Sequence, residues 1–283
     1  DLDWGAWFMD FKVGLQVYSV RDFAEKDLRG TLEKIKEMGY DGVEFAGLYG
    51  NEAGQVKNMV QDIGLIPVSA HVPLEEMLSN PDKVIGDYAE IGCRYIAIPY
   101  LVEERRPGRE GFERTIRDIG MVAEVAKKFD IQLLYHNHDF EFVRVNGEYG
   151  LDIIYKSISE ELLKTEIDTC WVNVAGEDPA DYIRKYSGRA PVVHLKDFVM
   201  KGKEKPKQLY ELIGIESEKQ DEADEAFGFR PVGYGVQDFS AIIKASEEAG
   251  AEWLIVEQDR PALGKTSLEC AAMSREYLKK LGI

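Results

Sequence analysis

The sequence predicts an α/β fold of the (β/α)8 TIM barrel type. Short runs rich in β-branched and aromatic residues alternate with amphipathic stretches along the chain of 283 residues. Eight runs of each kind fill the chain, which fits a closed parallel barrel. No Gly-x-Gly-x-x-Gly or Gly-x-x-x-x-Gly-Lys turn follows an early run, so a doubly wound parallel sheet is the weaker alternative.

Each predicted strand is a short apolar run, and each predicted helix has apolar residues at a spacing of 3.6. We expect the strands at residues 13–19, 42–46, 67–72, 95–101, 132–137, 163–169, 192–198 and 253–258. We expect the helices at residues 28–38, 55–63, 81–91, 111–129, 151–157, 179–186, 240–249 and 268–281. Asn80 and Asp178 are suitable N-terminal caps, and Pro81 suits the first helical position.

The whole chain, residues 1–283, is predicted to form a single barrel domain, because no segment resembles a linker. Residues 1–11 are expected to be an N-terminal extension, and residues 199–235 a long insertion after the seventh strand. The insertion contains an acidic run at residues 220–225. Such a run is typical of a solvated surface, and a lid or a subunit contact is the alternative.

Composition excludes several classes of partner. The net charge of −17 disfavours nucleic-acid binding, since a phosphate backbone attracts a basic face. The apolar runs are far shorter than the roughly 20 residues that cross a bilayer, and the first residues are acidic where a signal peptide is basic. Cys93, Cys170 and Cys270 form neither a metal-spaced cluster nor an even disulfide framework. We expect a cytoplasmic protein with a small-molecule partner, and a homo-oligomer or partner subunit stays open.

All four histidines fall at the ends of predicted strands. His71 ends the third strand, His136 and His138 end the fifth, and His194 lies in the seventh. Alternate side chains of a strand share a face, so His136 and His138 are expected to point the same way. The carboxyl ends of barrel strands converge on one mouth, where such residues become neighbours. The alternative is that these are ordinary core and loop histidines.

Two carboxylates, Asp168 and Glu257, also end apolar runs and are candidates for inward-facing groups. Charges buried between strands are costly unless they are paired, and a shared metal ion would satisfy several together. Two imidazoles and two carboxylates suit Mn²⁺, Co²⁺, Fe²⁺ or Zn²⁺ better than Mg²⁺ or Ca²⁺. The sequence therefore indicates a divalent metal at the mouth, with Mn²⁺ as the first choice.

Six strand-end motifs together resemble the sugar phosphate isomerase/epimerase family, which has the xylose isomerase-like barrel. They are Val-Glu-Phe (43–45), Ser-Ala-His (69–71), Tyr-His-Asn-His-Asp-Phe-Glu-Phe (135–142), Ile-Asp-Thr (167–169), His-Leu-Lys-Asp (194–197) and Val-Glu-Gln-Asp (256–259). The resemblance implies one metal ligand from each of strands five to eight, and the matching positions are His136, Asp168, His194 and Glu257. The departure is His136, because epimerases of this family commonly have a glutamate there that also removes the substrate proton.

The resemblance and the residues together imply a metal-dependent isomerase or epimerase acting on a sugar or a sugar-derived ketone. A dehydratase or lyase of the same family, acting on an inosose or a 3-oxo-glycoside, is the alternative. A nuclease on this fold is disfavoured because it would need more metal ligands and a basic rim. The non-enzyme alternative is a sugar-binding subunit without catalysis.

The catalytic candidates are His138 as general base, Glu257, and Lys196 as the partner of a developing oxyanion. His138 could instead orient a neighbouring ligand. Lys196 and Asp197 are adjacent, so at most one of them should face the pocket. The candidate substrate contacts are Tyr18, Glu44, His71, Trp171 and Arg260. The alternatives are rim ion pairing for Glu44, packing for Trp171 and Tyr18, and a surface position for Arg260.

Overall fold

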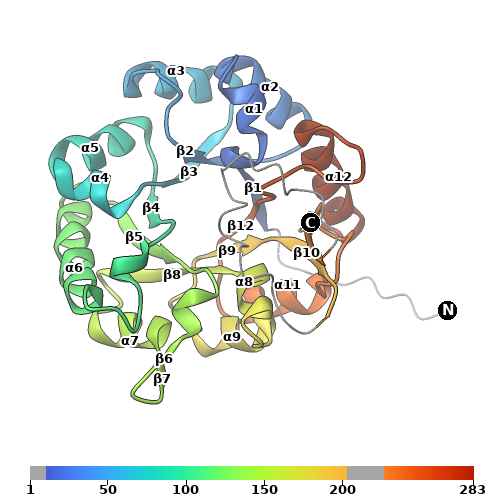
Figure 1. Ribbon diagram of the computed structural model, residues 1–283. Coiled ribbons are helices and arrows are strands. Elements are labelled where there is room, and N and C mark those ends of the chain that lie inside the picture. The colour runs from blue at the N-terminus through green and yellow to red at the C-terminus, as the bar shows by residue number, and fades with distance from the viewer. Residues whose placement is uncertain (1–10, 203–225) are drawn as a thin grey trace.

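The structure is a computed structural model that describes residues 11–202 and 226–283. Eight parallel strands close into a barrel in the order β1, β12, β9, β8, β5, β4, β3, β2, and helices surround them (Figure 1). The barrel strands are β1 (Lys12–Gln16), β2 (Gly42–Ala46), β3 (Ile66–His71), β4 (Tyr95–Ile98), β5 (Gln132–His136), β8 (Leu163–Asp168), β9 (Val192–Leu195) and β12 (Trp253–Val256). The predicted fold class is confirmed.

Each expected helix is present close to its predicted bounds. These helices are α2 (Leu28–Glu37), α3 (Ala53–Ile63), α5 (Pro81–Ile91), α6 (Phe112–Lys128), α7 (Gly150–Ser157), α9 (Pro179–Lys185), α11 (Phe239–Glu248) and α12 (Ser267–Lys280). The side chains of Asn80 and Asp178 accept backbone N–H groups and cap α5 and α9 as predicted. Short elements that were not expected are α1 (Arg21–Ala24), α4 (Leu74–Ser79), α8 (Thr169–Val174), η1 (Val17–Val20), η2 (Glu103–Arg105) and η3 (Phe140–Phe142).

Several strands end earlier than predicted. β1 ends at Gln16, because the Gln16 side chain accepts a hydrogen bond from the backbone N–H of Tyr18 and starts the 3-10 turn η1. β4 ends before Pro99, which has no N–H for the sheet. β5 ends at His136, so the strand predicted to carry His138 gives way to a loop. The polar ends of these runs therefore form the loops of the barrel mouth.

The seventh strand also departs from its prediction, because it divides at Lys196. β9 ends at Leu195, and β10 (Asp197–Met200) leaves the barrel to pair antiparallel with β11 (Phe227–Arg230). The carboxylate of Asp197 accepts backbone N–H groups at 2.8 to 3.2 Å from Phe198, Gly233, Gly235 and Gln237. These bonds hold Asp197 in this outer two-stranded sheet. Lys196 alone of this adjacent pair faces the pocket, as predicted.

The remaining hairpin joins β6 (Arg144–Val145) to β7 (Glu148–Tyr149). Its two central residues, Asn146 and Gly147, have φ values of 51° and 87°. Positive φ at both positions is the requirement of a type I′ turn, which suits the twist of two antiparallel strands. The predicted loop at this place is therefore a short hairpin.

The lower part of the barrel interior is apolar. Its buried cluster is Val68, Tyr95, Ala97, Leu134, Val192, Trp253 and Ile255. The outward faces of the strands pack on the helices in a second, larger cluster. A bulge shifts the pairing of β2 with β3 after Val43, and His71 at the end of β3 then reaches the ring of His194 across the barrel. Ionisable side chains therefore begin directly above the apolar layer.

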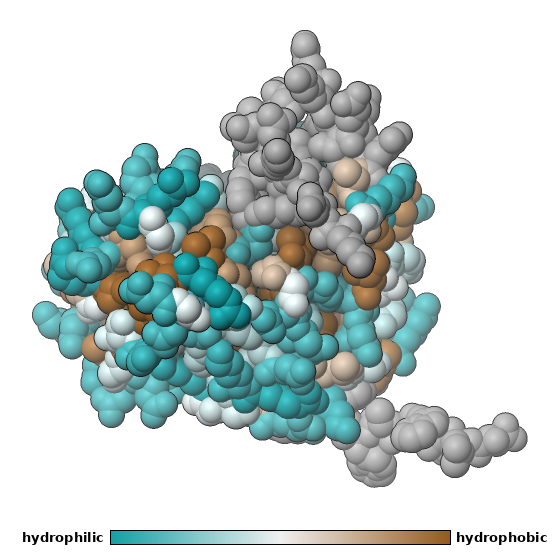
Figure 2. All heavy atoms as spheres, turned by 60° about the horizontal axis from the view of Figure 1, so that its bottom comes forward, coloured by the Kyte–Doolittle hydropathy of each residue, from teal (hydrophilic) through white to brown (hydrophobic). Residues whose placement is uncertain are grey.

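Two predicted segments lie outside the described residues: most of the extension at 1–11, of which only Phe11 is described, and the acidic run at 220–225 within the insertion. Within 11–202 and 226–283, no helix combines the length and the apolar character needed to cross a bilayer. The face in Figure 2 is mainly hydrophilic, and hydrophobic side chains gather in a band across its middle.

Candidate metal centre and active site

A cavity of about 640 Å³ lies at the carboxyl ends of the barrel strands. It is lined by Tyr18, Ala46, Gly47, His71, Pro73, Glu76, Pro99, Tyr100, His136, His138, Lys196, Glu257 and Asp259. Six of the candidate site residues are among these. Asp168, His194 and Glu44 are fully buried close to the lining residues, and Trp171 and Arg260 are not part of the lining.

Four buried side chains, His136, Asp168, His194 and Glu257, place one ligand atom each within 4.8 Å of one another. Nε2 of His136 is 3.1 Å from Oδ2 of Asp168. Nδ1 of His194 is 3.9 Å from the same oxygen and 3.7 Å from Oε1 of Glu257. Ligands on a tetrahedral ion with bonds of 2.0 to 2.2 Å are separated by about 3.3 to 3.6 Å. The four predicted ligands therefore fit a divalent ion.

The ring nitrogen Nδ1 of His194 supports this fit, since it is buried and has no hydrogen-bond partner among the described residues. A buried polar atom without a partner is costly, and coordination would satisfy it. Nδ1 of His136 lies 3.2 Å from the carbonyl oxygen of Pro99, to which it can donate. With the hydrogen on Nδ1, the lone pair of the ring would be on Nε2, which faces Asp168.

Lys196 is buried beside these ligands and contacts three carboxylates. Its Nζ is 2.8 Å from Glu257, 3.1 Å from Asp259 and 3.7 Å from Asp168. Burial lowers the pKa of Lys196, but Asp259 and Glu257 outweigh it and raise that pKa well above its ordinary value. For Glu257 the directions are reversed: burial raises its pKa, but Lys196 and His194 hold that pKa well below its ordinary value. When all are ionised, three negative charges face one positive charge, and a divalent ion would neutralise the surplus of two.

A second polar layer lies deeper in the barrel and contains Glu166, which the sequence reasoning missed. Nε2 of His71 is 2.9 Å from Oε1 of Glu44 and 2.6 Å from Oε1 of Glu166. Nε2 of His194 is 2.7 and 2.9 Å from the same two oxygens. Glu44 therefore pairs with histidines rather than with a lysine or arginine at the rim. Glu166 precedes Asp168 by two residues on the same face of β8, and this spacing was the signal that could have identified it.

His138 lies in the loop after β5, yet its ring still lines the cavity. The ring stacks on Phe140 at an interplanar angle of 4°, stacks on Trp171, and meets Tyr100 edge-on. Its centroid is 5.4 Å from that of His136. Burial lowers the pKa of His138 well below its ordinary value, and the neighbouring His136 and Lys196 lower it further. His138 is therefore held as a neutral imidazole.

The rest of the motif at 135–142 braces this loop. The backbone N–H of His138 donates to Oε1 of Glu141 at 2.9 Å, and the hydroxyl of Tyr135 donates to Oε2 at 2.7 Å. Burial raises the pKa of Glu141 to about 8. The side chain of Asn137 accepts the backbone N–H of Asp168 at 3.0 Å. The two bonds to Glu141 hold the loop that carries His138, and the bond from Asp168 to Asn137 joins this loop to β8.

The remaining candidates have different surroundings. Tyr18 lines the cavity, and the guanidinium of Arg21 lies 3.9 Å from the centre of its ring. Trp171 is fully buried and packs between His138 and Phe227, which favours the packing role over a sugar-stacking role. The carbonyl oxygen of Arg260 accepts a hydrogen bond from Gln258. Asp259 is a cavity residue that was not singled out, although it ends the motif at 256–259.

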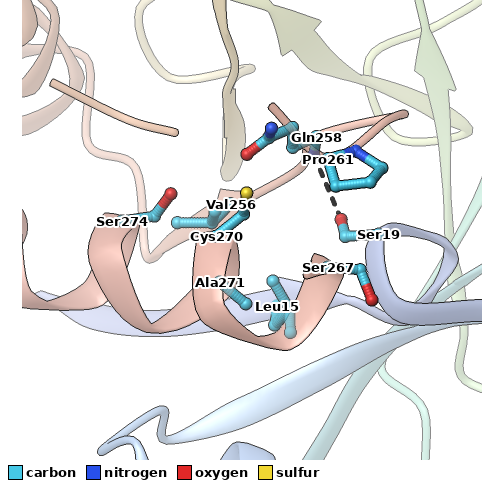
Figure 3. Close-up of a pocket in the computed structure, with 9 residues that line it drawn as sticks. All are labelled: Leu15, Ser19, Val256, Gln258, Pro261, Ser267, Cys270, Ala271 and Ser274. Carbon is cyan, nitrogen blue, oxygen red and sulfur yellow. Dashed lines mark hydrogen bonds between the residues drawn. The ribbon is translucent and has the colours of Figure 1, made fainter. Parts of the chain in front are cut away.

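A much smaller cavity lies between the end of β12 and α12 (Figure 3). Its volume of about 10 Å³ is room for a single water molecule. Figure 3 shows Gln258 and Ser19 on one side of it, joined by the hydrogen bond from the backbone N–H of Gln258 to Oγ of Ser19. The side-chain oxygen of Gln258 has no hydrogen-bond partner among the described residues, so this cavity offers one water an acceptor and is too small for a substrate.

Comparison with known proteins agrees with this architecture. The chain is 28% identical over 165 residues to an inosose dehydratase of Clostridium botulinum (strain Eklund 17B / Type B), which covers 57% of this chain and 52% of the relative. The chain thus spans about half the length of the curated relatives it matches.

Two solved structures show the same fold. One is a sugar phosphate isomerase/epimerase from Parabacteroides distasonis ATCC 8503, with a TM-score of 0.76 and 22% identity over 97% of this chain and 95% of that chain. The other is the IOLI protein with a bound zinc atom, with a TM-score of 0.72 and 15% identity over 95% and 97% of the two chains. The model of the xylose isomerase-like TIM barrel family matches residues 32–281. Because this match spans most of the sequence, the chain belongs to the family of xylose isomerase-like TIM barrels.

Proposed function

We propose that this chain is a divalent-metal-dependent enzyme that removes a proton next to the carbonyl group of a sugar or sugar-derived ketone. One observation carries the proposal. A neutral imidazole, His138, and a buried ammonium, Lys196, line the same cavity beside four residues whose ligand atoms are spaced for one ion. A base, an acid and a Lewis-acid site are the three parts that such a reaction needs.

When bound by His136, Asp168, His194 and Glu257, a divalent ion would polarise the carbonyl and acidify the adjacent C–H bond. The imidazole of His138 takes that proton, because burial keeps it unprotonated. The ammonium of Lys196 donates to the oxygen on which negative charge develops. Glu257 and Asp259 hold this ammonium in place at 2.8 and 3.1 Å.

The fate of the removed proton separates two reactions. If the proton returns to the same or the neighbouring carbon, the enzyme is an epimerase or isomerase. If the electron pair of the broken C–H bond instead forms a double bond, a β-hydroxyl leaves as water with a proton from Lys196, and the enzyme is a dehydratase. The pairing of one neutral base with one cationic acid favours elimination, and so does the similarity to inosose dehydratase.

The charges around the cavity favour an uncharged substrate. Among the lining residues, which all belong to the described part of the chain, Lys196 is the one lysine or arginine. Its charge is already matched by Glu257, Asp259 and Asp168. A phosphate group would add two further negative charges to this carboxylate-rich site. A free ketose, an inosose or a 3-oxo-glycoside fits better than a sugar phosphate.

The metal proposed is a transition metal, because the ligand set mixes imidazole and carboxylate. Mn²⁺ is the first choice, with Co²⁺, Fe²⁺ and Zn²⁺ as alternatives. Four other statements from the sequence remain predictions. They are that the chain is a single barrel domain, that it is cytoplasmic, that it binds neither nucleic acid nor membrane, and that it forms a homo-oligomer or has a partner subunit.

The test begins with elemental analysis of the purified chain and a screen of ketoses, inososes and 3-oxo-glycosides in D₂O. Deuterium incorporation without loss of water indicates isomerisation or epimerisation, and loss of water indicates dehydration. A chain that holds no metal and turns over none of these compounds would instead support the non-catalytic sugar-binding subunit.

A matched pair of variants then separates the roles of the two histidines in the loop. His138→Asn should keep the metal but lose turnover and solvent-deuterium exchange by a factor on the order of 10² to 10⁴. His136→Asn should lose the metal first. Proton exchange at the wild-type rate in His138→Asn would show that the base lies elsewhere, and Glu257 or His71 would then be the next residue to replace.

A further inference from the structure

His194 has different surroundings at its two ring nitrogens. Nδ1 faces the candidate metal ligands, 3.7 Å from Glu257 and 3.9 Å from Asp168. Nε2 faces the deeper polar layer, 2.7 Å from Oε1 of Glu44 and 2.9 Å from Oε1 of Glu166. A neutral imidazole has one N–H and one lone pair, so the group that holds the N–H decides where the lone pair points.

The deep layer is built from opposite sides of the barrel. Glu44 and His71 come from β2 and β3, and Glu166 and His194 come from β8 and β9, which lie across the barrel from them in the strand order (Figure 1). The rings of His71 and His194 are nearly parallel, at 13°, with centroids 5.2 Å apart. Glu44, Glu166 and His194 are completely buried, whereas His71 also lines the cavity.

The carboxylates of Glu44 and Glu166 have four oxygens, but only three hydrogens from the described residues are directed at them: one from Nε2 of each histidine, and one from the side-chain amide of Gln16, which donates to Oε1 of Glu44 at 3.1 Å. Each Nε2 can donate one proton, yet each lies within 2.9 Å of both Oε1 atoms. The Oε2 atoms of Glu44 and Glu166 have no hydrogen-bond partner among the described residues. An ionised carboxylate accepts but does not donate, so with both carboxylates in that form each histidine Nε2 carries the hydrogen. When His194 is neutral, its lone pair is then on Nδ1, which is the nitrogen that faces the metal ligands.

We propose that Glu44 and Glu166 are positioning residues of the metal centre, which hold the N–H of His194 on Nε2 and orient Nδ1 toward the ion. This inference rests on the metal site of the proposed function. The carboxylates touch neither the ion nor the substrate, and they act through the imidazole. Such outer partners of a ligating histidine typically change metal affinity by a factor of about 10 to 100.

The same residues raise a rival interpretation, in which the deep layer binds a second ion. His71, His136, Glu166 and His194 also offer ligand atoms within 4.8 Å of one another. However, the N···O contacts of 2.6 to 2.9 Å are hydrogen-bond lengths, shorter than the separation of about 3.3 Å between ligands of a tetrahedral ion. His136 and His194 also belong to the upper ligand set. The geometry therefore favours one ion above a hydrogen-bonded layer.

The test measures Co²⁺ binding by the full chain, because the visible absorption of Co²⁺ reports coordination geometry as well as occupancy. The variants are Glu166→Gln and Glu44→Gln, which replace a carboxylate by an amide of the same shape, and Glu166→Asp, which keeps the charge. Thr165→Val is the matched control, since Thr165 is the buried neighbour of Glu166 whose side chain points to the other face of β8. Affinity is read by competition with a chelator, and folding by thermal denaturation.

We expect one Co²⁺ per wild-type chain and the same affinity and spectrum in Thr165→Val. Glu166→Gln and Glu44→Gln should bind Co²⁺ about 10 to 100 times more weakly, with an altered spectrum, and Glu166→Asp should recover part of the loss. If Glu166→Gln does not fold, Glu44→Gln and Glu166→Asp decide the question by the same readouts.

Three outcomes would overturn the inference. Wild-type affinity and spectrum in both glutamine variants would show that the carboxylates serve stability alone, even if the melting temperature falls. Two ions per wild-type chain, with one lost in Glu166→Gln, would make the deep layer a metal site itself. A wild-type chain that binds no Co²⁺, Mn²⁺ or Zn²⁺ would remove the inference together with the metal dependence of the proposed function, whereas the first two outcomes leave that function standing.

Discussion

Replacing Lys196 by Met removes one positive charge from a fully buried site while keeping the length of the side chain. The ammonium lies 2.8 Å from Glu257, 3.1 Å from Asp259 and 3.7 Å from Asp168, and the side chain is only 1% exposed. Removing one partner of a buried ion pair costs about 3 to 5 kcal/mol, because the remaining charge stays uncompensated. For a chain of this size, each kcal/mol corresponds to about 2 °C, so the melting temperature should fall by about 6 to 10 °C.

The assay is thermal denaturation at pH 7 in a chelator and then in excess Mn²⁺. A divalent ion supplies positive charge to the same carboxylates, so Mn²⁺ should raise the melting temperature of Lys196→Met more than that of the wild type. The difference between the two proteins should also shrink below pH about 4, where carboxylates are protonated even in the unfolded chain. Turnover should fall by a factor on the order of 10² to 10⁴, since the acid is gone.

Lys156→Met is the control, because Lys156 forms an exposed pair with Glu148 that contributes at most about 1 kcal/mol. A melting temperature of Lys196→Met within 1 °C of the wild type in chelator would refute the reasoning. An identical stabilisation of both proteins by Mn²⁺ would show that the ion and the ammonium do not share the carboxylates.

Asp168→Ala or Glu257→Ala should remove the metal and lower the melting temperature, which elemental analysis and thermal denaturation would show; unchanged metal content in both variants would contradict the ligand assignment. Metal-free protein should lose stability as pH rises, because the protonated ring of His71 loses its charge and its attraction to Glu44 and Glu166. Burial lowers the pKa of His71, but these two carboxylates outweigh it and raise that pKa to about 10. This contribution is complete below the unfolded value of about 6.5 and is lost toward pH 10, so a melting temperature in chelator that rises over this range would disagree. Metal affinity should show the opposite trend and weaken as pH falls. Burial lowers the pKa of His194, but the carboxylates of Glu166 and Glu44 outweigh it and raise that pKa, so the ion must displace a proton from the ring. Constant affinity from pH 5 to 8 would exclude imidazole ligands.

The barrel itself could be predicted because its strands and helices have separate hydrophobic periods. The helix at α6 (Phe112–Lys128) buries Phe112, Thr115, Ile119 and Val122 on one face, which is the spacing that indicated it. Strand ends were harder to predict, because apolar runs continue past the last sheet hydrogen bond. The break between β9 and β10 at Lys196 is one example: the next residue, Asp197, accepts four backbone N–H groups, three of them from residues 233–237, and this partner segment is distant in sequence.

The resemblance of the sequence to the family identified His136, Asp168, His194 and Glu257 as candidate ligands, and each lies within one residue of the end of a barrel strand, where strand ends meet at the mouth. Only the tertiary structure decided how deep each group lies and which group it faces. Glu166 shares a face with Asp168, but its contact with His71 joins residues 95 positions apart, and that of His194 with Glu44 joins residues 150 apart. Local pattern specifies which face of a strand a residue occupies; the closure of the barrel determines which residues meet across its interior.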